Sequence, residues 1–218
     1  MLSRAAKSAF YQFAGPALWL SGVAYRQVKA PRSGFQRAHL GPGQRNYISG
    51  WINVDANRFS GKCDVWADLR NPLPFHDETL DAIYSHHMVE HLPDISAHFA
   101  DAYRCLKPGG VYRVAGPNGD TAIRKFQEGD AAWFGDWPDK YESIGGRLNN
   151  FILCRNEHLV ILTESLLREL LGRAGFTQVT PAVASVSTSY PALFEDCLRY
   201  EHESDLDAPR TVVLEARK

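Results

Sequence analysis

Short apolar runs alternate with helical patterns from residue 34 onward, and this alternation constrains the fold more than any other feature. The runs are bounded by turn residues, as buried strands are, and they cover residues 37–40, 51–55, 63–69, 80–85, 111–115, 176–183 and 211–216. Residues 94–106 and 163–174 instead place their apolar side chains at helical spacing. We therefore expect an α/β fold with a seven-stranded, mostly parallel sheet and helices on both faces.

Polar and small residues follow the early strands of this predicted sheet. In open parallel sheets, ligands bind outside the carboxyl ends of the strands, near the point where the strand order reverses. Gly41-Pro42-Gly43 follows the first run, Asp55 ends the second, Asp68 lies near the end of the third, and Ser85-His86 follows the fourth. These strand ends are the predicted ligand side.

The connection between the first two strands is unusually short. Residues 41–50 leave room for a turn or two of helix, whereas a parallel crossover normally takes a dozen residues or more. The segment also departs from G-x-G-x-x-G, because Asn46 stands where the third glycine would be. Alone, it is weak support for nucleotide binding.

Four motifs occur in a specific order along the chain: AHLGPGQRNYISGWINVDAN, DVWADLRNPLPFHDETLDAIYSHHMVEHL, CLKPGGVYRVAGPN and LTESLLRELLGRAGF. Together they resemble the class I S-adenosylmethionine-dependent methyltransferases, most closely a bacterial type 11-like subgroup with a shortened first loop. The resemblance covers about residues 36–179 and the last strand. It implies a Rossmann-like domain and S-adenosylmethionine as the cofactor, with S-adenosylhomocysteine as the product.

The resemblance also implies which residues hold the cofactor. Glycines allow close backbone approach to the ribose and methionyl part, and a carboxylate at the end of the second strand suits the ribose hydroxyls. The end of the third strand is expected to contact the adenine, and the end of the fourth strand is expected to contact the methionyl part. The predicted cofactor-binding residues are Leu40, Gly41, Pro42, Gly43, Asp55, Ala56, Asn57, Asp68, Leu69, Ser85 and His86. The alternative for both aspartates is ordinary capping of turns.

His87-x-x-Glu90-His91 has the form of a zinc-peptidase motif, H-x-x-E-H. That class needs a long helix and a further downstream ligand, whereas Pro93 follows almost at once. We therefore disfavour a metallohydrolase and predict no metal ligands here. We expect a short helix that lines the pocket, with Glu90 and His91 in a supporting role and His87 facing the substrate.

Transfer to a hydroxyl requires a base near pH 7, and histidine has a suitable pKa. His158, at the end of an insert that spans about residues 119–157, occupies a position where the wider family often places a pocket histidine. The predicted catalytic residues are His158, His87 and His91. Magnesium is a further option, with Asp120, Asp130 and Asp136 as oxygen ligands, although no clear motif supports it.

The insert is rich in aromatic residues, namely Trp133, Phe134, Trp137, Tyr141 and Phe151. We expect it to form the acceptor site for a small molecule or saccharide. The equally weighted alternative is a lid whose aromatic side chains only pack on the domain.

Residues 8–25 carry no charge and resemble the start of a signal peptide, but no A-x-A cleavage site follows. We expect residues 1–33 to form two short helices, broken at Gly15-Pro16, that pack on or cap the methyltransferase domain at 34–218. Contact with a membrane surface is the alternative.

The formal net charge of −1 provides no global field for nucleic acid, so we expect no such partner. The four cysteines, Cys63, Cys105, Cys154 and Cys197, are more than about forty residues apart, wider than metal or disulfide motifs use. Free thiols indicate a reducing compartment, so we expect a cytoplasmic protein. The oligomeric state and the acceptor are left open.

The sequence thus predicts an S-adenosylmethionine-dependent O-methyltransferase that acts on a small molecule or saccharide with a histidine as general base. An N-methyltransferase is the nearest alternative, because it would not need a strong base. A non-catalytic protein that binds S-adenosylmethionine is the second.

Overall fold

The computed structural model describes residues 4–59 and 61–218, with side chains from residue 9 onward except at residue 60. Six α-helices, three 3-10 turns and seven strands follow one another in these residues. In chain order they are α1 (Arg4–Val28), β1 (Arg37–Leu40), β2 (Ile52–Asp55), β3 (Val65–Trp66), β4 (Leu80–His86), η1 (Val89–His91), α2 (Ile95–Cys105), β5 (Leu106–Pro117), α3 (Gly119–Gln127), η2 (Ala131–Phe134), α4 (Ile144–Leu153), α5 (Glu164–Ala174), β6 (Gln178–Ala182), α6 (Pro191–Phe194), η3 (Glu195–Tyr200) and β7 (Thr211–Arg217).

The seven strands form one sheet in the order β3-β2-β1-β4-β5-β7-β6. The pairs from β3 to β5 are parallel, whereas β7 runs antiparallel to both β5 and β6. The predicted seven-stranded, mostly parallel sheet is confirmed. The strand order reverses between β1 and β4, so the residues that follow these two strands lie at the switch point.

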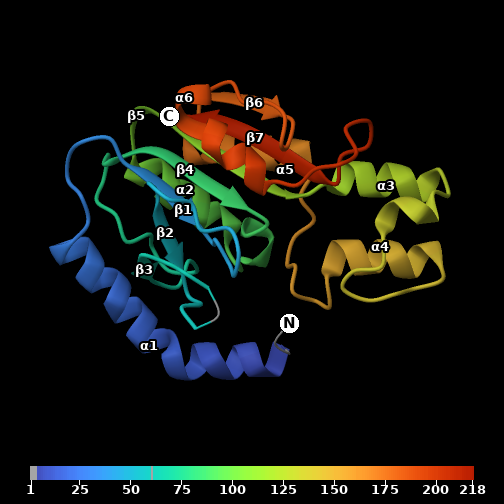
Figure 1. Cartoon of the computed structure of the whole chain (residues 1–218), viewed down its shortest axis with the longest axis horizontal. Helices are drawn as coiled ribbons and strands as arrows, with labels where there is room; N and C mark the ends of the chain where they lie inside the picture. The colour runs from blue at the N-terminus through green and yellow to red at the C-terminus, as the bar shows by residue number, and fades with distance from the viewer. Residues whose placement is uncertain (1–3, 60) are drawn as a thin grey trace.

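Both faces of the sheet are covered, as Figure 1 shows. On one face, Phe99 of α2 and Leu167 of α5 pack with strand residues such as Ile83 in the main hydrophobic core. On the other face, Phe194 of α6 packs with Tyr84. Neighbouring strand residues 83 and 84 thus face opposite sides, as the period of two in a strand requires.

The helix ends follow from particular residues. The Asp94 side chain accepts a hydrogen bond from the Ala97 backbone at the start of α2, and Thr163 does the same for Leu166 at the start of α5. Gly175 ends α5 with a φ of 108°. The third strand is shorter than predicted, because only Val65–Trp66 pairs with β2.

The expectation of two N-terminal helices is wrong, because α1 is a single helix that contains Pro16. Proline removes one hydrogen bond and crowds the preceding turn, at a cost of about 3 kcal/mol in a helix interior. Packing offsets this cost on the carboxyl side of Pro16. Leu18 is fully buried there, and the Tyr25 ring meets Phe75 edge-on at 6.3 Å.

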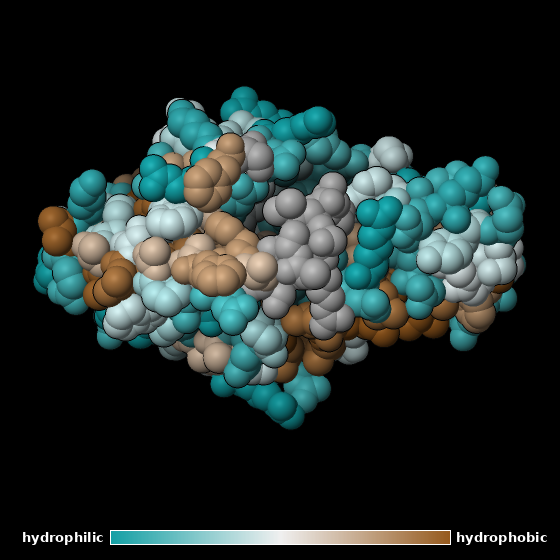
Figure 2. All heavy atoms as spheres, turned by 90° about the horizontal axis from the view of Figure 1, so that it is seen from below, coloured by the Kyte–Doolittle hydropathy of each residue, from teal (hydrophilic) through white to brown (hydrophobic). Residues whose placement is uncertain are grey.

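The outer side of α1 exposes apolar side chains, and Figure 2 shows apolar surface on this face of the molecule. The exposed apolar residues of α1 include Phe13, Trp19, Leu20, Val23 and Val28. Within the described residues, no helix has both the length and the apolar character needed to cross a membrane.

The predicted insert contains α3, η2 and α4, which extend beyond the carboxyl end of β5 (Figure 1). Trp133 and Phe134 are buried there and pack with Ala208 and partly buried Phe151. The Trp133 indole donates to the Ala208 carbonyl oxygen at 2.8 Å. The insert therefore has a small core of its own that is tied to the loop before β7.

Candidate active site

The glycine turn after β1 lies against the tip of β2. Gly41 has a φ of 74° and Gly43 a φ of 59°, a region that favours glycine. The Gly43 amide donates to Asp55 Oδ2 at 2.9 Å, which fixes the turn to the second strand. A Cβ on Gly41 would lie 2.6 Å from Met88 Cγ, whereas one on Gly43 would meet no atom within 4 Å. Gly43 therefore borders open space at the switch point.

Asp55 is the central carboxylate of this turn. Its Oδ1 accepts from the Asn57 amide at 2.7 Å, and the Ala56 amide is a third backbone donor to this carboxylate. Burial raises the pKa of Asp55, and the backbone donors at Asn57 and Gly43 oppose that shift. A ligand hydroxyl that donated to this carboxylate would complete its hydrogen bonds.

The residues around Asp55 stabilise the turn through burial and local hydrogen bonds. Leu40 and Pro42 are buried, and the Ala56 carbonyl oxygen accepts from the Trp66 indole at 2.7 Å. Asn57 caps its own turn, since its Oδ1 accepts from the Phe59 amide at 3.3 Å.

Asp68 follows β3, and both of its carboxylate oxygens accept hydrogen bonds from Arg70. The Arg70 side chain approaches both of its oxygens, with Nη2 at 2.6 Å from Oδ2 and Nε at 2.9 Å from Oδ1. The Arg70 guanidinium also lies 3.6 Å from the ring centroid of Tyr11 in α1. Leu69 Cδ1 lies 4.0 Å from the position that a Gly41 Cβ would take, so this loop does approach the glycine turn.

The side chains of Ser85 and His86, at the end of β4, point in different directions. Ser85 Oγ is hydrogen-bonded to the Tyr112 hydroxyl at 2.9 Å, and both residues are fully buried, so this side chain points into the core. His86 stacks on Tyr84, with ring centroids 6.4 Å apart. Burial lowers the pKa of His86 to about 2, so this imidazole is neutral and a poor base near pH 7.

His87, Glu90, His91 and His158 form one cluster beside the β4 tip, which we call the Glu90 cluster. Glu90 is fully buried, and its Oε1 lies 3.4 Å from His87 Nδ1, 3.9 Å from His91 Nε2 and 4.0 Å from His158 Nε2. Burial alone would raise the pKa of Glu90, but the His87 and His91 imidazoles hold it below its ordinary value.

The predicted short helix is only partly correct. The 3-10 turn η1 covers Val89–His91, and His87 stands before it with a φ of 51°, in a region that non-glycine residues rarely adopt. The His87 side chain is 41% exposed, compared with 39% for His91 and 9% for His158. Its Nε2 lies 3.5 Å from Thr211 Oγ1.

His158 reaches the cluster because its loop is bound to η1. The Leu159 amide donates to the Glu90 carbonyl oxygen at 2.8 Å. Burial lowers the pKa of His158, partly opposed by the nearby Glu90 carboxylate. The sequence predicted His158 and His87 individually, but Glu90 as their common partner follows only from this long-range contact.

The suggested magnesium ligands do not come together. The Asp120 side chain accepts from the Glu164 amide, Asp130 pairs with Lys125, and Asp136 pairs with Arg147. Among the described residues, the only group of three side chains that meets the spacing of a metal site is Glu90, His91 and His158.

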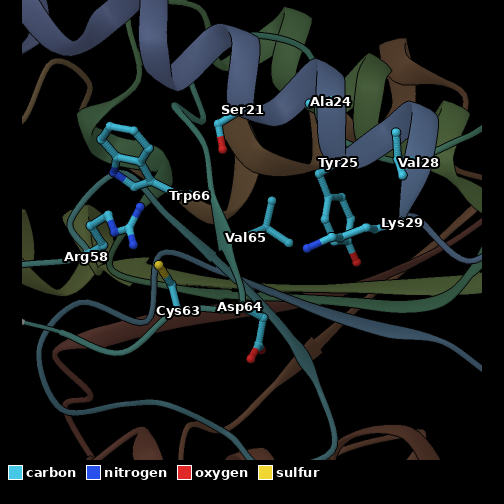
Figure 3. A pocket seen from close by; sticks show the side chains of 10 residues that line it. All are labelled: Ser21, Ala24, Tyr25, Val28, Lys29, Arg58, Cys63, Asp64, Val65 and Trp66. Carbon is cyan, nitrogen blue, oxygen red and sulfur yellow. The ribbon is translucent and has the colours of Figure 1, made fainter.

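Two cavities lie along α1 rather than at the strand tips. The larger, of about 480 Å³, lies between α1 and the β3 edge, and Figure 3 shows Tyr25 of the helix and Lys29 just after it opposite Cys63 and Asp64. The smaller, of about 210 Å³, reaches Asp68. Neither is lined by the Gly41 turn or by Asp55.

Comparison with known proteins gives matches to part of the chain. Residues 53–114, from β2 into β5, match a family model described as a methyltransferase domain. Over 56 residues the chain is 43% identical to cycloartenol-C-24-methyltransferase 1 of Oryza sativa subsp. japonica. That segment is 25% of this chain and 16% of the rice protein, so the chain spans only a small part of this relative.

Solved structures share the fold over nearly the whole chain. A SAM-dependent methyltransferase of Thermotoga maritima, described as a possible histamine N-methyltransferase, is similar with a TM-score of 0.53 and 16% identity, covering 97% of this chain and 94% of that one. A SAM-dependent methyltransferase of Archaeoglobus fulgidus has a TM-score of 0.52 at 16% identity, over 99% and 95% of the two chains. At this identity the likeness shows the fold alone. Residues 53–114 thus match a methyltransferase domain, and the chain as a whole shares its fold with solved SAM-dependent methyltransferases.

Proposed function

We propose that this protein binds S-adenosylmethionine at the tips of β1 and β2 and transfers its methyl group to a hydroxyl oxygen of a small molecule or saccharide. The observation that carries the proposal is the juxtaposition of two features. The Gly41–Gly43 turn with Asp55 lies at the switch point. The Glu90 cluster lies next to this turn, because Met88, between His87 and η1, packs against Gly41.

The chain's residues fit the cofactor. Gly43 borders open space, and the Asp55 carboxylate, which backbone amides hold in place, keeps acceptor capacity for a ribose hydroxyl. When bound, the cofactor supplies an activated methyl group on a sulfonium. The residues of the chain then align the acceptor, exclude water and remove a proton.

Asp55 is the residue we assign to the ribose, with Gly41 and Gly43 beside the methionyl part. Asp68 and Leu69 remain on the adenine side, but Arg70 already donates to both Asp68 oxygens. We therefore assign the adenine contact to Leu69 and the loop backbone, with Asp68 holding Arg70. Ser85 would position the strand tip through Tyr112 rather than touch the ligand.

His87 is the proposed general base. Its Nδ1 faces the Glu90 carboxylate, which favours the tautomer with hydrogen on Nδ1 and leaves Nε2 able to accept the acceptor's proton. His87 also follows β4 directly and is the most exposed of the three cluster imidazoles. His91 and His158 flank Glu90 from the other sides.

Methyl transfer from a methyl-labelled donor to a panel of hydroxyl and amine acceptors tests this function. With the acceptor found, His87→Gln should lower kcat by about 100-fold or more, because a positioned base contributes about 10²–10⁴. His76→Gln, in the loop before β4, is the control and should retain full activity. An unchanged rate for His87→Gln would favour the N-methyltransferase alternative, and turnover with no acceptor would favour a binding protein.

We also propose that α1 contacts a membrane surface and that the protein resides in the cytoplasm. The exposed apolar side of α1 supports contact with a surface. All four cysteines are free thiols, three of them buried, which supports a reducing compartment such as the cytoplasm.

A further inference from the structure

The Glu90 carboxylate is an exception to the rule that buried polar groups are hydrogen-bonded. Its side chain is fully buried, but its closest imidazole, at His87 Nδ1, is 3.4 Å from Oε1, and neither oxygen has a well-formed hydrogen bond from the residues that the structure describes. Leaving a buried charged group unpaired costs several kcal/mol. Something other than these protein donors is therefore expected to complete its coordination.

Two imidazoles are oriented toward the unpaired carboxylate. His91 Nδ1 lies 2.9 Å from the Glu157 carbonyl oxygen, and His158 Nδ1 lies 2.9 Å from the Ile152 carbonyl oxygen. A carbonyl oxygen can only accept, so in both rings Nδ1 carries the hydrogen. In the neutral rings both Nε2 atoms then present lone pairs toward Glu90 Oε1, at 3.9 and 4.0 Å.

Protonated rings would form ion pairs with Glu90, whereas neutral rings present lone pairs that a cation can bind. A neutral imidazole with its lone pair toward a carboxylate repels it, whereas a cation between them attracts all three ligands. Histidines that bind metal commonly donate their other N–H to a backbone carbonyl, as His91 and His158 do here.

The spacing suits one small ion. The candidate ligand atoms of Glu90, His91 and His158 all lie within 4.8 Å of one another. Ligands bound at the usual zinc distances of about 2.0–2.2 Å lie roughly 3.3 Å apart, so small side-chain rotations would close the site. His91 is 39% exposed and offers an entry path, while Glu90 and His158 form the buried side.

The fold fixes these ligands from three segments. Glu90 Oε2 lies 3.3 Å from where a Cβ on Gly116 would stand, so the carboxylate rests on a glycine of β5. The backbone pair between Leu159 and Glu90 holds the His158 loop in place. The H-x-x-E-H spacing is therefore misleading, because the third ligand comes from the distant His158 and not from His87.

We propose that Glu90, His91 and His158 bind one divalent transition-metal ion of the zinc type. Two nitrogen ligands and one carboxylate suit Zn²⁺ and its neighbours Co²⁺ and Fe²⁺, whereas Mg²⁺ prefers oxygen ligands. The site shares Glu90 and His91 with the peptidase motif that we disfavoured but takes its third ligand from His158, and it is separate from the aspartates first considered for magnesium. It does not depend on which acceptor the enzyme uses.

Metal uptake by the full chain, stripped with chelator and dialysed, tests the proposal. Titration with Zn²⁺ should give one equivalent per chain, and Co²⁺ should give visible absorption bands from a nitrogen-containing site. His158→Gln and His91→Gln should each weaken Zn²⁺ binding by about 10-fold or more, the scale of losses seen around metal sites. His87→Gln should keep one equivalent, and His76→Gln is the control outside the cluster.

Glu90→Gln should also lose the metal, but a buried change can impair folding, so the two histidine variants carry the test. Binding of S-adenosylhomocysteine to each variant verifies that the domain is folded. Loss of metal with cofactor binding intact supports the site. Absence of uptake by the wild type, or equal uptake by His158→Gln, would overturn it, and failure to bind the cofactor would count against the proposed function instead.

Discussion

At the scale of single residues, Asp55 and Asp68 look alike in sequence but differ in their surroundings. Asp55 accepts from the backbone amides of Gly43, Ala56 and Asn57 and keeps acceptor capacity for a ligand hydroxyl. Asp68 is occupied by Arg70. Both lie at the end of a predicted strand, so the sequence assigned both of them to the ligand.

We expect Asp55→Asn to weaken binding of S-adenosylhomocysteine by about 10- to 100-fold, because hydrogen bonds to a charged group contribute roughly 1.5–3 kcal/mol. Asp68→Asn should weaken it less. Asp81→Asn is the matched control, since Asp81 pairs with Lys107 near the start of β4. Calorimetric titration of the three variants provides the comparison, and an equal effect of Asp55→Asn and Asp81→Asn would argue against the ribose role.

At the scale of elements, the aromatic residues of the insert divide into two groups. Trp133 is 5% exposed and packs in the small insert core, whereas Trp137 is 67% exposed and Tyr141 is 40% exposed. The sequence could not separate these groups, because their burial depends on Ala208 near the other end of the chain. Only the exposed pair can contact an acceptor directly.

We therefore expect Trp137→Ala and Tyr141→Ala to raise the KM for the acceptor several-fold while leaving the Tm within a few degrees. Trp133→Ala should instead lower stability by about 3–5 kcal/mol, as for other buried large-to-small changes. Steady-state kinetics and thermal unfolding of the same variants test this division. If Trp137→Ala and Tyr141→Ala changed neither KM nor kcat, the insert would be a packing element without an acceptor role.

At the scale of the whole molecule, the alternation of apolar runs and helical patterns sufficed to predict the sheet, the helix α2 and the caps of α5. Local pattern encodes these features. Three features were missed for one reason, namely that they depend on contacts between distant segments. These are the continuity of α1 through Pro16, the shortness of β3 and the meeting of Glu90 with His158.

Two buried histidines make folding stability depend on pH. Burial lowers the pKa of His39 to about 4 and that of His98 to about 4, while both titrate near 6.5 when unfolded. Their neutral forms are favoured in the fold, so stability is complete above about pH 6.5 and falls as the pH decreases towards about 4. Each contributes a loss of roughly 3 kcal/mol at most.

Urea unfolding at pH 7 and pH 5 measures this dependence. His39→Gln should show a smaller loss between the two pH values than the wild type, because one of the buried imidazoles that burial keeps neutral is gone. The same loss in both proteins would show that other groups, such as carboxylates, govern the pH dependence.

The central claim is that the turn after β1 and the carboxylate at the tip of β2 hold the adenosyl cofactor. The measurement that tests it most directly is calorimetric titration of the full chain with S-adenosylhomocysteine, compared with Asp55→Asn. We predict one binding site per chain and a clear loss of affinity in the variant. Absence of binding to the wild type, or identical affinity in both proteins, would contradict the account.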